Sequence, residues 1–384
     1  MSKVDKYSIE LLVKKILLER DLFKFHPYLR DGVDVFISKD TLVHFIYLSS
    51  RKRIVLQVIP ELIQALTWFN GKTSVQTLNE RFLNIKPKNI KNDAFILFVK
   101  YLVEKCILID KSDASGSYIY SAKCEKQINF FVDLLDSEEQ AAALQAKINH
   151  LHIAIFGVGG VGSWVLQLLV QLGVKNFNLF DHDDFDHADL ARNAFYERNA
   201  EGKNKATWTG DHIKFHYPEV EVKSHPLKLT ANTNLENFIT KENIIVNAAD
   251  EPYIGYTSIK LSRYCIEKNL PLLVAGGFDA HLGSLGELII PGVTPCADCY
   301  AHFFQEALVD WKPITHPVQD RASGFGGLCS LSVFSASTIV MKLIKYLAFG
   351  SSVVEGGRGE LLFQEYKLDT FTVDRNPNCT FCSK

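Results

Sequence analysis

Two pairs of cysteines are the clearest chemical signal in the sequence. Cys296 and Cys299 form one C-x-x-C pair, and Cys379 and Cys382 form a second pair roughly eighty residues further on. This spacing is typical of a tetrahedral zinc site. Four thiolates leave no open coordination position, so we expect a structural zinc ion that ties the last residues back to the preceding domain. A redox role is the poorer interpretation, because neither pair follows the first strand of a thioredoxin-like unit.

A glycine-rich loop predicts a nucleotide-binding site. The apolar run 151–156 indicates a buried strand, and a helical pattern begins beyond four closely spaced glycines: Gly157, Gly159, Gly160 and Gly162. A strand, such a loop and a helix let backbone amides approach phosphates where a side chain would block them. Asp181 and Asp183 follow the next expected strand, where a carboxylate can meet a ribose hydroxyl. A nicotinamide-dependent dehydrogenase would share all of these features.

Polar residues beyond the loop indicate which nucleotide binds. Arg192, either Lys203 or Lys205, and Asp250 lie just after expected strand ends, the edge at which such sheets bind ligands. Cations at that edge would neutralise a triphosphate while its α-phosphate is attacked, and a carboxylate would hold magnesium. Because hydride transfer needs neither, the sequence favours Mg-ATP over a nicotinamide cofactor.

Taken in order, these motifs resemble the ThiF/MoeB adenylyltransferases of the ubiquitin-activating superfamily, over roughly the last 230 residues. The resemblance implies that Asp181 binds the ATP ribose and that Asp183 lies beside it. It implies that Arg192 and Lys205 hold the phosphates. It also implies that Asp250 coordinates magnesium.

Several residues modify what the resemblance implies. Asp189 and Asn193 stand where the family pattern has Asn and Gln, so the contacts of those two positions are open. Lys126 stands where family members carry a basic residue, usually Arg, that reaches into the partner subunit's site, and this implies a homodimer. The segment 326–329 resembles the microcin-type enzymes of the superfamily. Sulfur-transferring relatives use a loop cysteine to accept the activated carrier, and Cys329, the last residue of this segment, could do so. At the head of an apolar helix, however, we expect a packing thiol.

Residues 1–110 are expected to form a separate domain. Strand-like runs over 33–37, 42–48 and 54–58 precede three helical patterns. This order resembles the winged-helix-like, PqqD-like module with which the peptide-modifying branch of the superfamily recognises the leader of a ribosomal precursor peptide. Independently of the resemblance, a small sheet with an exposed polar edge can accept an extended peptide as an added strand, and residues 55–58 are the expected edge.

The rest of the chain is expected to be α/β. The polar, breaker-rich stretch 111–117 predicts a domain boundary, so we expect a linker and helix over 111–147. Strand-like and helical runs then alternate, which predicts a Rossmann-like, doubly wound sheet with structural zinc over 148–384. The predicted architecture is therefore an α/β adenylating domain preceded by a winged-helix-like α+β domain.

The sequence predicts an Mg-ATP-dependent adenylyltransferase that activates a carboxylate of a ribosomally made precursor peptide, as in the biosynthesis of a modified, antibiotic-type peptide. Three alternatives stay open: an enzyme that activates a ubiquitin-like sulfur-carrier protein, a nicotinamide dehydrogenase, and a non-catalytic scaffold that delivers a peptide. The dehydrogenase leaves the cysteine pairs, Arg192, Lys205 and Asp250 without a role.

Composition excludes some classes of partner. A formal net charge of −2 and a pI near 6.6 lack the positive surplus with which proteins bind nucleic acid. The first residues lack the apolar core of a signal peptide, and no uninterrupted apolar run approaches the ~20 residues that span a bilayer. We therefore expect a cytoplasmic protein that binds neither nucleic acid nor membrane.

Overall fold

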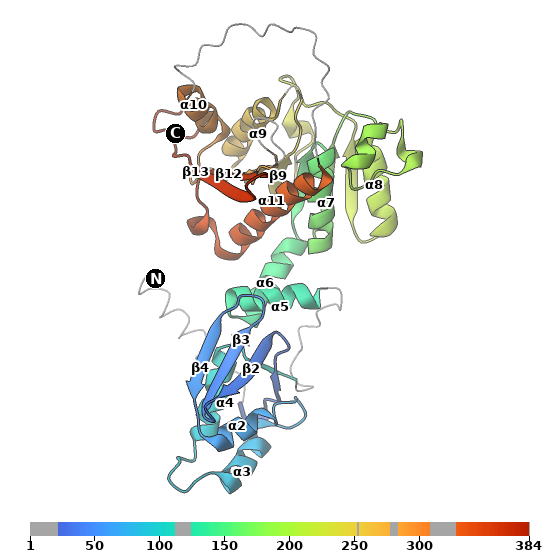
Figure 1. The fold of residues 1–384 in the computed structure, drawn as a ribbon. Coiled ribbons are helices and arrows are strands. Elements are labelled where there is room, and N and C mark those ends of the chain that lie inside the picture. Colours follow the sequence, from blue (N-terminus) through green and yellow to red (C-terminus); the bar gives the residue numbers. More distant parts are fainter. Residues whose placement is uncertain (1–21, 112–123, 252, 277–282, 308–327, 384) are drawn as a thin grey trace. The chain divides into compact units, whose positions relative to one another are not determined.

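The computed structural model places two compact units along the chain (Figure 1), which divide between Gln145 and Ala146. The structure describes residues 22–111, 124–251, 253–276, 283–307 and 328–383. Each unit has a hydrophobic core of its own, so each is stabilised by burial within itself.

The first unit is built on a three-stranded antiparallel sheet in the order β2-β3-β4. Its strands are β2 (Val33–Ser38), β3 (Leu42–Tyr47) and β4 (Arg53–Gln57). Three helices follow, namely α2 (Pro60–Leu66), α3 (Val75–Ile85) and α4 (Ala94–Glu104). These six elements confirm the strands and helices predicted from the sequence. A further antiparallel pair was not predicted: β1 (Pro27–Leu29) and β5 (Leu108–Asp110).

Alternation along β3 explains how the first unit buries its core. Val43, Phe45 and Tyr47 point to the same face of the sheet and have no exposed surface. The Phe82 ring of α3 stacks on the Phe95 ring of α4, with 5.5 Å between ring centroids, inside the same cluster. The helices therefore pack on one face of the sheet, while β4 forms one of its edges.

Helix α5 (Glu125–Leu135) belongs to the first unit, which corrects the predicted linker and helix over 111–147. Arg30 and Asp133, each 2% exposed, form a buried ion pair with 2.5 Å between Nη1 and Oδ1. Arg30 also donates through Nε to the Cys106 carbonyl at 2.9 Å. This pairing explains the correction, because it joins α5 to a residue about a hundred positions earlier. Most of α6 (Glu138–Asn149) also lies in the first unit, and residues 112–123 lie outside the described residues.

The second unit contains a six-stranded sheet in the order β11-β10-β9-β6-β7-β8. Its strands are β6 (His152–Phe156), β7 (Asn176–Phe180), β8 (Glu221–His225), β9 (Ile244–Asn247), β10 (Leu272–Val274) and β11 (Glu287–Ile289). β11 runs antiparallel to β10, and all other neighbours are parallel. This confirms the predicted α/β, Rossmann-like sheet, with one antiparallel edge. The strand order reverses between β6 and β9, and ligands of such sheets bind outside the carboxyl ends at that point.

Five helices accompany this sheet: three connect its strands, and two follow β11. They are α7 (Gly160–Leu172), α8 (Lys205–His216), α9 (Ile254–Lys268), α10 (Ala297–Ala307) and α11 (Cys329–Phe349). Leu261 of α9 and Tyr300 of α10 join Ala154 and Ile245 of the central strands in one buried cluster. A hairpin of β12 (Gly357–Leu362) and β13 (Lys367–Thr372) then precedes the second cysteine pair.

Helix α11 is long and apolar enough, by length and composition alone, to cross a membrane. Within the described residues it packs against α7 (Figure 1), and Ser335, Ala336 and Ile339 are among its buried residues. Core helices of soluble proteins pass the same test of length and composition. The absence of membrane binding therefore stays a prediction.

Candidate functional site

The glycine loop joins β6 to α7 beside the point where the strand order reverses. Gly157 has φ +86°, and a side-chain carbon there would come within 2.6 Å of the Ala248 backbone. At Gly162 the added carbon would lie 1.9 Å from the Gly157 carbonyl oxygen, whereas at Gly159 it would meet nothing within 4 Å. Packing thus requires glycine at two positions, and Gly159 leaves open space beside the backbone.

Asp181, the residue predicted to bind a ribose, supports the glycine loop. Its Oδ2 accepts the Val158 N–H at 2.8 Å, and its Oδ1 accepts the Asp183 N–H at 2.9 Å. Burial raises the pKa of the Asp181 carboxyl, although these two hydrogen bonds oppose that rise. Each carboxylate oxygen retains a second lone pair for a ligand. Asp183, with 53% of its side chain exposed, is the more accessible of the two carboxylates.

One buried carboxylate brings together the two cations predicted to bind phosphate. Asp189 has no exposed side-chain surface, and its Oδ2 lies 3.2 Å from Lys205 Nζ. Its Oδ1 lies 3.4 Å from Arg192 Nε. Lys205 is 7% exposed and also lies 3.6 Å from Asp183 Oδ2, whereas the Arg192 side chain is 54% exposed. The structure therefore places a mixed cluster of charges at the carboxyl edge of the sheet.

The structure distinguishes Lys205 from Lys203. Asn204 caps α8 by accepting the Thr207 N–H, and its amide donates to the Asp181 carbonyl at 3.1 Å. This places Lys205 in the first turn, against Asp189. Lys203 instead lies over the Trp208 ring, 4.2 Å from its centroid. Of the two lysines that the sequence left open, Lys205 is the one at the cluster.

The segment that carries Arg192 is tied to the glycine loop. The Asn193 amide donates to the Val158 carbonyl at 2.8 Å, and the Trp164 indole donates to the Arg192 carbonyl at 3.0 Å. A side-chain carbon at Gly160 would lie 3.3 Å from Arg192 Cδ. Asn193 therefore has a structural role here, and the Arg192 stem lies directly against the loop.

Asp250, the predicted magnesium ligand, is exposed just beyond β9. Its neighbour Glu251 forms an ion pair with Lys228. Glu251 Oε2 also lies 3.0 Å from His182 Nε2, which in turn lies 3.3 Å from Asp183 Oδ1. None of His182, Glu251 and Lys228 was selected from the sequence. They approach one another only because β7, β8 and β9 end at the same edge, which leaves no local signal.

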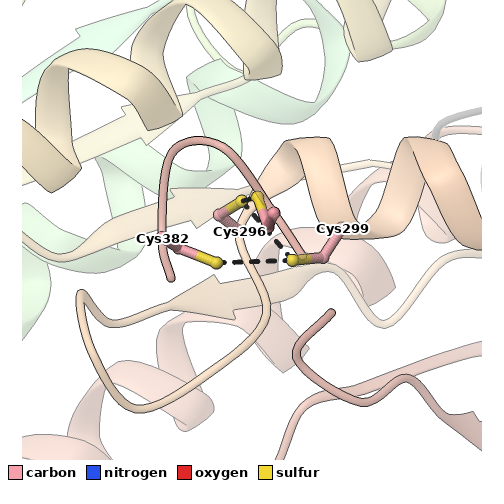
Figure 2. Close-up of side chains that lie close together, drawn as sticks. Cys296, Cys299 and Cys382 are labelled. Carbon is pink, nitrogen blue, oxygen red and sulfur yellow. Dashed lines mark hydrogen bonds between the residues drawn. The ribbon is translucent and has the colours of Figure 1, made fainter. Parts of the chain in front are cut away.

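The four paired cysteines converge into one buried cluster (Figure 2). Cys296 Sγ lies 3.6 Å from both Cys299 Sγ and Cys379 Sγ, and Cys299 Sγ lies 3.4 Å from Cys382 Sγ. A tetrahedral Zn²⁺ with bonds of about 2.3 Å would hold its sulfurs about 3.8 Å apart. The donor set and spacing therefore fit a closed, four-coordinate metal ion.

Residues around the cysteines hold the chain's end in place. Arg263 of α9 makes a bidentate ion pair with Asp298, at 2.7 and 3.2 Å, between the two cysteines of the first pair. The Arg263 guanidinium also lies 4.0 Å from the centroid of the Phe381 ring, between the two cysteines of the second pair. The Asn376 N–H donates to Cys299 Sγ at 3.4 Å. Both pairs are thus fixed by contacts beyond the sulfurs.

Comparison with known proteins identifies the family. The model of the ThiF family matches residues 127–380, which include the glycine loop, the charged cluster, the first cysteine pair and Cys379 of the second. The chain belongs to the ThiF family. Members of this family are ATP-dependent adenylyltransferases, so this ThiF-family chain is assigned to adenylation and not to hydride transfer.

Curated relatives of this ThiF-family chain include ubiquitin-like modifier-activating enzyme 5 from two organisms. The enzyme of Dictyostelium discoideum is 24% identical over 291 residues, which cover 68% of this chain and 72% of that protein. The enzyme of Caenorhabditis elegans is 24% identical over 216 residues, which cover 52% of this chain and 48% of that protein.

Solved structures with the same fold include E. coli MccB with ATP and PaaA. MccB is 20% identical with a TM-score of 0.66, and the match covers 93% of this chain and 99% of MccB. PaaA is 18% identical with a TM-score of 0.68, and the match covers 90% of this chain and all of PaaA. MccB, the microcin C7 biosynthetic enzyme, has also been solved in complex with N-formylated MccA.

The remaining candidate residues of this ThiF-family chain lie as follows. Lys126 is exposed in the first turn of α5, and its reach into a partner subunit stays a prediction. Cys329 is half-buried at the first residue of α11. Gly326 and Gly327, which precede it, lie outside the described residues.

Proposed function

We propose that this enzyme adenylates a carboxylate of a ribosomally made precursor peptide, as a step in making a modified, antibiotic-type peptide. The observation that carries the proposal is the 93% coverage of this chain in the match to MccB. Such coverage includes most of the first unit, which a carrier-activating enzyme of the short type does not need. The likeness concerns the fold, so the peptide substrate is our inference.

The charged cluster supports the chemistry of adenylation. A peptide carboxylate oxygen attacks the α-phosphorus of ATP, the bond from that phosphorus to the bridging oxygen breaks, and pyrophosphate leaves with the electron pair. Lys205 and Arg192 would neutralise the triphosphate and the developing charge on pyrophosphate. The glycine loop would orient the phosphates through backbone N–H groups. The acyl adenylate then offers AMP as a good leaving group to a nearby nucleophile.

Two metal ions belong to this proposal. Asp250 would bind Mg²⁺ together with phosphate oxygens, since Mg²⁺ is held in such sites by one or two carboxylates and the substrate. There Mg²⁺ would supply neutralising charge for pyrophosphate. A structural Zn²⁺ would occupy the Cys296, Cys299, Cys379 and Cys382 cluster, whose burial and spacing fit it.

The partners follow from the same reasoning. Strand β4 lies at an edge of the first sheet, and Val55 on it is 45% exposed, so an extended peptide can add to it as another strand. We further infer a homodimer in which Lys126 reaches the partner's nucleotide site. We place the enzyme in the cytoplasm, without nucleic-acid or membrane partners.

The proposal is tested by Asp250→Ala. With a peptide encoded by a short reading frame beside the gene, we expect ATP-dependent pyrophosphate release to fall by roughly a hundredfold or more. Mass spectrometry of the peptide would show the loss of its modification. Asp211→Ala, which removes an exposed carboxylate paired with Lys214 on α8, serves as the matched control. A fully active Asp250→Ala enzyme would contradict the assignment.

A second candidate function is activation of a ubiquitin-like carrier protein. It is favoured by the curated relatives, which are ubiquitin-like modifier-activating enzymes. If it holds, a carrier that ends in Gly-Gly should stimulate ATP–pyrophosphate exchange where the peptide does not. Cys329→Ser should then abolish transfer of the activated carrier, whereas peptide adenylation predicts little change in that variant.

A further inference from the structure

Asp189 differs from the other charged groups of the nucleotide site because its carboxylate cannot reach solvent. Its side chain has no exposed surface, and it contacts both phosphate-binding cations with separate oxygens. The Asp186 N–H also donates to Asp189 Oδ2 at 3.2 Å. Asp189 is thus fixed in position in the middle of the 3₁₀ segment His187–Ala191.

The charges around Asp189 balance. Lys205 and Arg192 carry two positive charges, and Asp189 and Asp183 carry two negative charges within 3.6 Å of them. A bound triphosphate would therefore compete with Asp189 for both cations. The competition is unequal, because Lys205 is buried against Asp189 and Arg192 is mostly exposed and contacts Asp189 through Nε. The terminal nitrogens of Arg192 are then the groups that can turn toward a phosphate.

We propose that Asp189 is a positioning residue that fixes Lys205 and restrains the pull of both cations on the polyphosphate. Binding energy that holds ATP and pyrophosphate equally does not speed adenylation, and it slows the release of pyrophosphate. A fixed carboxylate beside the cations weakens that uniform binding. It also keeps Lys205 in one geometry, which favours the transition state over the ground state. This inference rests on the proposed adenylation.

The test is Asp189→Asn, which removes the charge and keeps the side-chain shape. The Asn oxygen still accepts the Asp186 N–H, so the 3₁₀ segment is expected to persist. We expect α,β-methylene ATP and inorganic pyrophosphate to bind about tenfold more tightly. In peptide-dependent turnover, both KM for ATP and kcat should fall. A purely structural role for Asp189 would not combine tighter nucleotide binding and a lower KM with a lower kcat.

The matched control is Asp186→Asn. Asp186 caps the same segment, and Asn is an equally good N-cap, but Asp186 makes no ion pair with Lys205 or Arg192 in the described part of the chain. We expect its nucleotide affinity and kcat to match the wild type. Unchanged nucleotide affinity in Asp189→Asn, or a raised KM for ATP, would overturn the proposal.

A double variant distinguishes the proposed effect from misfolding caused by an unpaired buried charge. Lys205→Gln combined with Asp189→Asn neutralises both members of the buried pair, which leaves neither charge unpaired. Relative to Lys205→Gln alone, the double variant should bind α,β-methylene ATP at most about threefold more tightly, the part due to Arg192. A full tenfold effect in that background would overturn the role assigned to Lys205. These titrations need no peptide, so they test the role of Asp189 even if the proposed peptide substrate is wrong.

Discussion

Two buried carboxylates in this chain are alike in burial and opposite in their surroundings. Asp133 faces Arg30, and both side chains are 2% exposed, so this pair is closed to solvent. Asp189 faces Lys205, which is buried, and Arg192, which is 54% exposed. A closed pair has no charged group that a ligand can reach, whereas the second cluster keeps such a cation. The exposure of the partner, more than that of the carboxylate, separates a structural pair from a functional one.

Breaking the closed pair should produce the largest effect. Asp133→Leu leaves the Arg30 guanidinium buried without its counter-charge, which typically costs about 3–5 kcal/mol. We expect the first unit to unfold at lower urea concentration, and the amides of α5 to exchange hydrogen faster by mass spectrometry. The double variant Arg30→Met/Asp133→Leu should recover most of the loss, since no charge is left buried.

An exposed pair on the same unit provides the control. Lys52 and Asp136 lie 2.6 Å apart, but their side chains are 40% and 51% exposed. Asp136→Asn should therefore change the free energy of unfolding by less than about 1 kcal/mol. Equal stability of Asp133→Leu and wild type would remove the distinction between closed and open pairs.

The open cluster should respond strongly in activity. Lys205→Ala is expected to lower kcat/KM for ATP by about 10²–10³, because it removes a cation from the transferring phosphate. Lys203→Ala is the neighbouring control. It removes a contact with the Trp208 ring worth about 0.5–1 kcal/mol and should keep kcat/KM within roughly threefold. Steady-state kinetics and thermal unfolding of both variants test this, and similar losses of activity in the two would contradict it.

Two substitutions in the glycine loop should have the smallest effects, one on stability and the other on ligand binding. Gly162→Ala should destabilise the second unit by about 1–3 kcal/mol, because the new carbon overlaps the Gly157 carbonyl. Gly159→Ala meets no protein atom within 4 Å, so stability should persist while ATP affinity falls by about tenfold. Thermal unfolding and nucleotide titration report the two effects. Normal ATP binding by Gly159→Ala would show that phosphates do not approach the loop there.

Local patterns predicted most of the core elements. Strand β6 and the three strands of the first unit were predicted from apolar runs and alternation, because these patterns follow directly from which residues are buried. Strand β8 was not found, since Glu221–His225 is mostly polar at the edge of the sheet. Helix α8 was also not found, because its apolar residues do not gather on one face.

Site residues were predictable where a motif ties them to the backbone. The glycines, Asp181 and the cysteine pairs are spaced by local geometry, so their positions could be inferred. The bridging role of Asp189 could not, because it depends on a contact with Lys205, sixteen positions away on another element. The choice between Lys203 and Lys205 was open for the same reason, although Asn204 as a helix cap was a usable signal.

The Arg30–Asp133 pair has a consequence for protein engineering. A chimera that exchanges the first unit, the module proposed to bind the peptide, would by its sequence be cut in the breaker-rich stretch 111–117. Such a cut would separate Asp133 of α5 from Arg30, its partner in the buried ion pair. A junction after Gln145 would carry α5, with Lys126, along with the module it is bonded to. The transplantable part of this enzyme is therefore longer than its sequence suggests, and it includes the residue proposed to act on the neighbouring subunit.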